Sequence, residues 1–180
     1  MLDCKAMATT MDTNLKLLSD ETSKLVEMTQ YRQIIESLMY LTNTRSDICF
    51  VVNTLSQYLV KPRHVHMIAA KHVMRYLKGM IDFGLYYDGD HDYRLYVYID
   101  AYWVGSTSDR KRTSSGYYCM GSTMISWFSR KLSSVVLSTA EAEYIGSCCP
   151  SCEAICLHNL MLGLFDLKLD TTLILCDNQI

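Results

Sequence analysis

Two aspartates follow apolar stretches of the chain at positions where a divalent metal ion could bind. Asp100 comes directly after the alternating apolar residues of YRLYVYI, and Asp177 comes after the wholly apolar run TLILC. A carboxylate at the end of a buried strand is costly unless a partner or a cation neutralises its charge. The simpler interpretation is a turn aspartate that caps the following segment, and it accounts for either residue taken alone.

A third carboxylate, Glu143, lies in a helix that the sequence predicts between these two strands. The capping box Ser138–Glu141 marks the start of this helix. A strand–helix–strand connection usually places its strands in parallel, so Asp100 and Asp177 would meet at one sheet edge. Like charges at that distance repel unless a cation relieves them. Two aspartates and one glutamate suit paired Mg²⁺ ions, which activate a water for phosphodiester hydrolysis.

Basic residues gather in three clusters although the 180-residue chain has a formal net charge of −2. The stretch 61–78 contains Lys and Arg residues but no acidic residue. A single cluster usually forms a solvated surface, whereas three together are compatible with contacts to nucleic-acid phosphates. The clusters include Lys71, Arg75 and Lys78, then Arg110, Lys111 and Arg112, and finally Arg130 and Lys131.

The 8 cysteines predict reduced thiols rather than a disulfide framework, because no secretory signal pattern precedes them. Four of them lie close to a histidine, and zinc binds both residue types. A second ligand pair is missing elsewhere, so burial in a helix core is favoured over a zinc site. These residues are Cys148, Cys149, Cys152, Cys156 and His158.

Composition indicates a soluble intracellular protein, in the cytoplasm or the nucleus, without a membrane partner. Hydrophobic residues make up 49% of the chain, which is enough for a core. Uninterrupted apolar runs all fall short of the roughly 20 residues that cross a bilayer.

The first part of the chain predicts helices after a polar segment, 1–30, that we interpret as a loop or an extended arm. Apolar spacing indicates helices over 31–41, from Ser46 towards Pro62, and over 64–78. The last of these would expose its basic residues to solvent. Its expected buried stripe consists of Val65, Ile68, Ala69, Val73 and Leu77.

The sequence also indicates whether five aromatic side chains are exposed or buried. The histidines of the third helix are expected to be partly exposed, facing RNA or solvent. The two tryptophans are expected to pack in the core rather than stack on bases. These residues are His64, His66, His72, Trp103 and Trp127.

The second part of the chain shows a period of two, with a boundary expected within 80–92. A long helix should run from Ser138 past Leu157, although Pro150 within it would cost about 3 kcal/mol through a lost hydrogen bond. The unbroken apolar run of the last strand predicts cover on both faces. The fold class is therefore α+β. The expected strands span 84–87, 93–100, 115–120, 124–129 and 171–177.

Six motifs together resemble the end of a copia-type long-terminal-repeat retrotransposon Pol polyprotein, in order and in spacing. The resemblance implies that residues 1–90 form a connection-like helical segment that follows the reverse-transcriptase polymerase core. Residues 91–180 would begin a ribonuclease H-like domain, an incomplete mixed sheet with one crossover helix. The motifs are YRQIIESLMYLT, KPRHVHMIAAKHVMRYLKG, DRKRTSSGY, ISWFSRK, LSTAEAEYIG and ILCDNQ.

The resemblance implies that Asp100, Glu143 and Asp177 are catalytic residues that hold two Mg²⁺ or Mn²⁺ ions. The substrate would be the RNA strand of an RNA–DNA hybrid, and the other partner would be the remainder of the polyprotein. The family continues to a later acidic residue, and it usually has a second aspartate where Tyr102 stands. We therefore expect little activity from this chain alone. The alternatives are a non-catalytic remnant that binds nucleic acid weakly and, more remotely, a cysteine-based metal binder.

Overall fold

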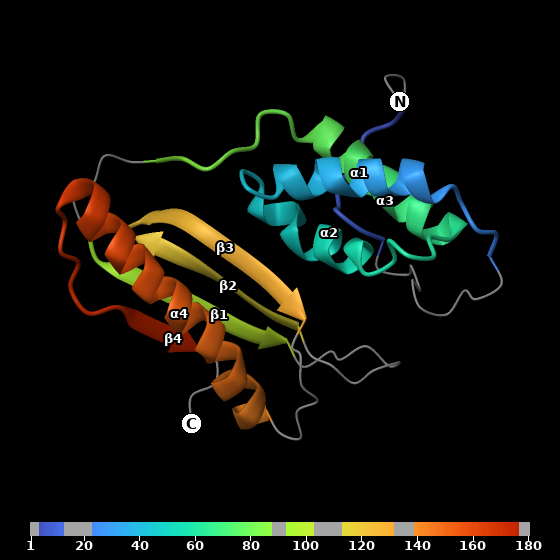
Figure 1. Cartoon of the computed structure of the whole chain (residues 1–180). Helices are drawn as coiled ribbons and strands as arrows, with labels where there is room; N and C mark the ends of the chain where they lie inside the picture. Colours follow the sequence, from blue (N-terminus) through green and yellow to red (C-terminus); the bar gives the residue numbers. More distant parts are fainter. Residues whose placement is uncertain (1–3, 13–22, 88–92, 103–112, 132–138, 177–180) are drawn as a thin grey trace. The chain divides into compact units, whose positions relative to one another are not determined.

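The computed structural model divides the chain into two compact units, Met1–Leu85 and Tyr86–Ile180. The first unit is helical, and the second contains a four-stranded mixed sheet with one long helix (Figure 1). The architecture is α+β, as the sequence predicts. The division falls within 80–92, while the identities expected for the two parts remain predictions. The structure describes residues 4–12, 23–87, 93–102, 113–131 and 139–176.

The helices of the first unit begin and end close to the predicted positions. The segment before α1 is tied to the start of α3, because the His64 amide donates to the Lys24 carbonyl oxygen at 2.9 Å. Helix α1 begins before the predicted start at residue 31. The elements are α1 (Met28–Leu41), the short 3₁₀ helix η1 (Ser46–Ile48), α2 (Cys49–Ser56) and α3 (His64–Gly79).

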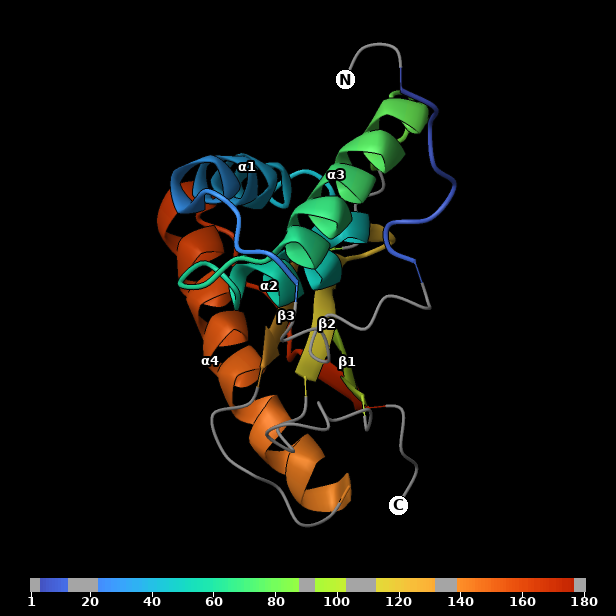
Figure 2. The ribbon, with the colours of Figure 1, turned by 90° about the vertical axis from the view of Figure 1, so that its right-hand side faces the viewer.

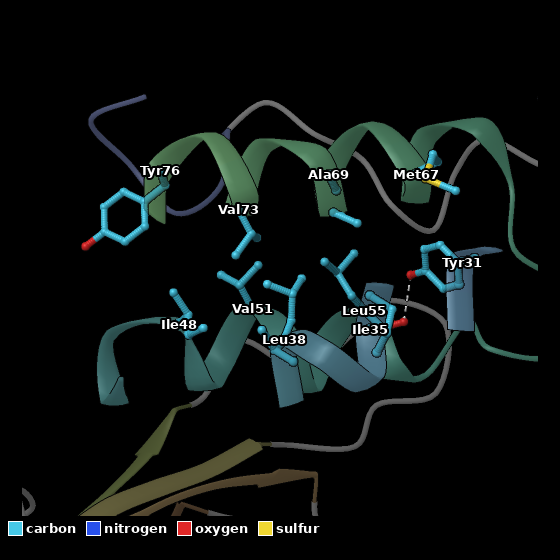
Figure 3. Packing of buried hydrophobic residues seen from close by; sticks show 12 residues of the cluster. Tyr31, Ile35, Leu38, Ile48, Val51, Leu55, Met67, Ala69, Val73 and Tyr76 are labelled. Atoms are coloured by element: carbon cyan, nitrogen blue, oxygen red, sulfur yellow. Dashed lines mark hydrogen bonds between the residues drawn. The ribbon is translucent and has the colours of Figure 1, made fainter. Parts of the chain in front are cut away.

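Apolar residues from all three α-helices meet in one core, which Figure 3 shows from close by. The hydroxyl of Tyr31, which is fully buried, donates to the Leu55 carbonyl oxygen at 2.9 Å. Burial raises the pKa of Tyr31 well above its usual value, and the nearby Tyr58 adds to the shift. The core contains Tyr31, Ile35, Leu38, Ile48, Val51, Val52, Leu55, Met67, Ala69, Ala70, Val73 and Tyr76.

Helix α3 presents a different stripe to this core from the predicted one. Ile68 is 47% exposed, whereas His66 and Met67 are buried. The Arg63 amide donates to Nδ1 of His66 at 3.0 Å, and the His66 ring stacks on Tyr58 with centroids 3.9 Å apart. These contacts turn His66 inward and Ile68 outward. The predictions of a buried Ile68 and an exposed His66 were therefore wrong.

A charged network joins η1 to the end of α3. The Arg45 guanidinium donates to both carboxylate oxygens of Asp47, at 2.9 and 2.7 Å. The Tyr76 hydroxyl donates to the same carboxylate at 2.8 Å, and Arg45 also donates to the Met80 carbonyl oxygen at 3.0 Å. The hydrogen bonds from Arg45, above all, hold the pKa of Asp47 below its usual value, although partial burial acts in the opposite direction.

The sheet of the second unit has the strand order β3-β2-β1-β4. Strands β1, β2 and β3 pair antiparallel in sequence, whereas β4 pairs parallel to β1. The parallel pair confirms the predicted strand–helix–strand crossover. The elements are β1 (Leu95–Tyr102), β2 (Thr113–Met120), β3 (Thr123–Lys131), α4 (Thr139–Phe165) and β4 (Leu173–Cys176).

Two strand predictions were wrong. Residues 84–87 form no strand, because no neighbouring strand pairs with them in the part of the chain that the structure describes. All four residues of β4 are exposed, although their unbroken apolar run predicted cover on both faces. Strand β4 lies at the edge of the sheet, where a strand has only one hydrogen-bonded neighbour.

Helix α4 packs on one face of the sheet and contributes the buried Ala154 to its core. Pro150 lies inside α4, and the helix continues through it to Phe165, in agreement with the predicted helix past Leu157. The proline ring is fully buried, and the Tyr118 hydroxyl donates to the Pro150 carbonyl oxygen at 3.2 Å. Position 146, four residues before Pro150, is a glycine and therefore has no side chain. The cost of the proline is therefore offset by burial and by this hydrogen bond.

The outer side of α4 is apolar and exposed. Tyr144 is 83% exposed, and Ile155, Leu164 and Phe165 are also exposed. The stretch Tyr144–Phe165 is long and apolar enough to cross a membrane by length and composition, although polar residues such as Glu153 interrupt its apolar run. In the structure this helix lies on the sheet.

The Arg45–Asp47 network predicts a specific acid sensitivity of the first unit. Because the pKa of Asp47 is lowered in the folded state, its contribution to stability is present above the unfolded value of about 3.9. The contribution is lost as the pH falls through the lower, folded pKa. We expect Asp47→Asn to lower the free energy of unfolding at pH 6, and the difference from wild type to narrow from about pH 4 towards pH 2.

Urea unfolding followed by circular dichroism at each pH measures this difference. Asp82→Asn is the matched control, since Asp82 is exposed and belongs to the same unit. A wild-type advantage that stays constant down to pH 2 would contradict the assignment of this titration to Asp47.

Candidate functional site

Asp100 occupies an exposed position near the end of β1. Its backbone pairs with Ser115 of β2, and β1 continues to Tyr102, two residues beyond the predicted end of the strand. Val97 and Ile99 are buried on the side that packs against α4. Because side chains alternate along a strand, Asp100 belongs to the opposite face of the sheet.

The register of β1 and β4 relates Asp100 to the second aspartate, Asp177. Ile99 of β1 pairs in parallel with Cys176 of β4. The next residues in the sequence are Asp100 and Asp177, and Asp177 lies outside the described residues. The pairing of the two aspartates therefore remains a prediction that the register of the strands before them allows.

Glu143 belongs to α4, but its side chain lies outside the described part of the structure. Its neighbours in the chain, Glu141 and Tyr144, are both exposed. Gly146 is the first residue of α4 that is described as buried. The beginning of α4 and the ends of β1 and β4 lie towards the same end of the second unit (Figures 1 and 2). Glu143 thus precedes the part of the helix that is buried on the sheet.

A glycine sets the distance between α4 and β2. A Cβ atom on Gly146 would lie 3.2 Å from Oγ and 3.6 Å from Cβ of Ser114. Ser114 is buried, and its hydroxyl has no hydrogen-bond partner among the described residues. The beginning of α4, and with it the backbone of Glu143, therefore lies in close contact with Ser114, and a larger side chain at position 146 would require Ser114 to shift.

The basic residues of α3 are only partly available to a ligand. Lys71 and Lys78 are exposed, but an N-terminal segment, Cys4–Asp12, lies along this side of the helix. Nε of Arg75 donates to the Lys5 carbonyl oxygen at 2.7 Å, and Nζ of Lys78 donates to the Cys4 carbonyl oxygen at 2.9 Å. The expectation of an exposed basic face is thus confirmed for Lys71 and Lys78, whereas Arg75 is half-buried, and carbonyl oxygens of the N-terminal segment accept hydrogen bonds from Arg75 and Lys78. Arg110, Lys111 and Arg112 lie outside the described residues.

The cysteine cluster of α4 forms neither a core nor a zinc site in the structure. Cys148, Cys149, Cys152 and Cys156 are all exposed, which corrects the expected burial. Among the described residues no group of three metal-binding side chains comes together. The ring Nε2 of His158 lies 2.6 Å from Oγ1 of Thr172, so this histidine links α4 to the segment before β4. The four cysteines are thus accessible on the surface of α4.

An aromatic row crosses the sheet face opposite α4, and the sequence analysis missed it. Tyr98, Tyr117 and Trp127 are direct partners in the register of β1, β2 and β3. The rings of Tyr98 and Tyr117 stack with centroids 4.8 Å apart. Burial raises the pKa of Tyr117 above its usual value. Alternation shows that these residues point away from α4, but only the strand register reveals that they are neighbours. Trp103 lies outside the described residues.

Several known proteins that are similar to this chain come from transposons. The chain is 39% identical over 178 residues to the retrovirus-related Pol polyprotein from transposon RE2 of Arabidopsis thaliana, covering 99% of this chain and 12% of that protein. The corresponding protein from transposon RE1 is 35% identical over the same shares. An uncharacterized mitochondrial protein of Arabidopsis thaliana is 37% identical over 80% of this chain and 60% of its own length.

These similarities define the class of the protein, and the chain belongs to the copia-type retrotransposon Pol polyproteins. The chain spans about an eighth of the length of the polyproteins it matches, 12% for RE2 and RE1. No protein-family model and no solved structure matches the chain.

The contact between Gly146 and Ser114 predicts opposite effects of two substitutions. Gly146→Leu should destabilise the second unit by about 1–3 kcal/mol, because the added side chain would overlap β2. Ser114→Ala should stabilise it by about 1 kcal/mol, because a buried hydroxyl without a partner is removed. Urea unfolding followed by tryptophan fluorescence reports on this unit, since Trp103 and Trp127 both belong to it.

The control for the glycine substitution is Gly163→Leu in the same helix. A Cβ atom at Gly163 would have nothing within 4 Å. Equal stability of the two leucine variants would show that Gly146 does not set the approach of α4 to the sheet.

Proposed function

We propose that the second unit is the first part of a ribonuclease H-like domain that hydrolyses the RNA strand of RNA–DNA hybrids with the help of divalent cations. The support from the fold is a strand order β3-β2-β1-β4 with three antiparallel strands and one parallel crossover strand. This arrangement agrees with the order of elements that the family resemblance implies. The other partner would be the remainder of a polyprotein, because this chain matches a part of such proteins.

The observation that carries the proposal is the parallel register of Ile99 and Cys176. The residue that follows each of them in the sequence is an aspartate. The two strands therefore lead, in the sequence, to a carboxylate at equivalent positions. Asp100 is exposed and supplies oxygen ligands, which Mg²⁺ and Mn²⁺ prefer. Asp100 thus fits a hard cation at the end of the strand pair.

Three carboxylates would hold the ions, namely Asp100, Glu143 and Asp177. When bound, the ions activate a water and stabilise the leaving oxygen of the phosphodiester. Alternation assigns Asp100 to the face opposite α4, whereas Glu143 belongs to α4 itself. The carboxylates can meet only past the ends of the strands, where α4 has not yet reached the sheet. The chain's own contribution is to fix these three backbone positions.

The alternative is a non-catalytic remnant that retains the fold. The residue at position 102 is tyrosine instead of the aspartate usual in the family, which favours this alternative. Pro150 does not favour the non-catalytic remnant, because helix α4 continues through this residue and the proline ring is buried.

Metal binding tests the proposed site directly. We expect Mn²⁺ to bind the wild-type chain and Asp82→Asn equally, and Asp100→Asn to lose at least about tenfold in affinity, because it loses a ligand charge. Isothermal titration calorimetry measures the affinity. Cleavage of a labelled RNA–DNA hybrid in Mg²⁺ or Mn²⁺ should be weak in wild type and absent in Asp100→Asn. Unchanged Mn²⁺ affinity in Asp100→Asn would exclude Asp100 as a ligand.

We further propose that the basic side of α3 contacts the nucleic-acid backbone. Lys71, Arg75 and Lys78 lie at helical spacing and extend from one helix, and Lys71 and Lys78 are exposed. Phosphate contacts by such residues release counterions, so that binding weakens as salt rises.

Fluorescence anisotropy with a labelled RNA–DNA hybrid over a salt series tests this surface. The logarithm of the affinity should fall linearly with the logarithm of the salt concentration, and Lys71→Gln should reduce the slope by about 1. Lys24→Gln is the control, because Lys24 is an exposed cation that lies outside α3. A slope that is the same in wild type and Lys71→Gln would contradict the proposal.

A further inference from the structure

The N-terminal segment Cys4–Asp12, which we call the arm, binds α3 through the cations of that helix. Three carbonyl oxygens of the arm lie within hydrogen-bonding distance of three side chains of α3. All three side chains carry, or on protonation can carry, positive charge. The contacts are Lys78 Nζ to Cys4 O at 2.9 Å, Arg75 Nε to Lys5 O at 2.7 Å, and His72 Nε2 to Thr9 O at 2.9 Å.

A few short contacts hold the arm in place. Met7 and Met11 pack, partly buried, against the core of the first unit. The Met7 amide donates to the Arg75 carbonyl oxygen at 3.3 Å. At the end of α3, a Cβ atom on Gly79 would lie only 3.0 Å from Cβ of Ala6. The arm is therefore seated closely against the end of α3 at Gly79.

The arm leaves space beside the cations that it binds. A cavity of about 330 Å³ lies between the arm and α3 and is lined by Cys4, Ile68, Lys71, His72 and Arg75. The arm oxygens are neutral carbonyls, whereas phosphate oxygens carry charge. A cation and a charged phosphate attract each other through their full charges, which a neutral carbonyl oxygen does not offer. A nucleic-acid backbone would therefore make stronger bonds with the same donors.

We infer that the arm is an intramolecular strap that occupies the phosphate-binding donors of α3 and must leave before a nucleic acid can bind there. This inference rests on the proposed contact between α3 and nucleic acid. Only molecules in which the arm has left can bind, so the apparent affinity equals the intrinsic affinity multiplied by the fraction of such molecules. Substitutions that displace the arm without changing a charge should therefore strengthen binding.

Two substitutions enlarge the same contact from opposite sides. Gly79→Leu adds a side chain on α3, and Ala6→Leu adds one on the arm, and both overlap the 3.0 Å contact between these residues. Gly84→Leu is the matched control, since a Cβ atom there would have nothing within 4 Å. All charged residues are retained in the three variants. We expect the first two variants to bind a labelled RNA–DNA hybrid about tenfold more tightly than wild type, and the control to match wild type.

Hydrogen exchange measured by mass spectrometry over residues 4–12 follows the arm itself. Exchange should be faster in Gly79→Leu and Ala6→Leu than in wild type, and it should accelerate in wild type when the hybrid is added. Salt-dependent binding of equal affinity in all variants would overturn the strap while the proposed α3 surface stands. Binding to wild type without faster exchange in the arm would overturn it as well. If no variant binds the hybrid, the proposed surface and the strap both fail.

Discussion

Helix α4 reaches the sheet through residues with little or no flexible side chain, and this close approach organises the second unit. Gly146, Pro150 and Ala154 recur at intervals of four, so they lie on one side of the helix. The ring of Pro150 and the methyl group of Ala154 are buried against the strands. A larger side chain at Gly146 would require Ser114 of β2 or the start of the helix to shift. The backbone of Glu143 precedes this contact by less than one turn, so its position depends on it.

The geometry of the strands limits what the carboxylates can do. Parallel pairing brings Ile99 next to Cys176, and the residue that follows each is an aspartate. Because side chains alternate between the two faces of the sheet along β1, however, Asp100 belongs to the face that α4 does not cover. A shared cation would have to sit past the strand ends, where side chains from both faces can converge. The same alternation places the aromatic row of Tyr98 and Tyr117 on the uncovered face of the sheet.

The first unit shows how one helix serves two surfaces. One side of α3 packs its apolar residues and His66 into the core, and the ring of His66 also stacks on Tyr58. The other side carries Arg75 and Lys78, whose donors are occupied by carbonyl oxygens of the arm. Cations that meet neutral acceptors remain able to exchange them for charged ones. In the proposed strap, the arm and a nucleic-acid backbone would compete for the same side chains.

The sequence by itself determined the kinds of elements and their order, because apolar periodicity and capping residues act locally. It predicted α1, α2, α3, the hairpin strands, α4 and the parallel pairing of β4 with β1. Only the tertiary structure decided which side of each element faces a partner. His66 is buried and Ile68 exposed, β4 is exposed at the sheet edge, and the cysteines of α4 are exposed. These outcomes depend on contacts between residues that are distant in the chain, which periodicity does not encode.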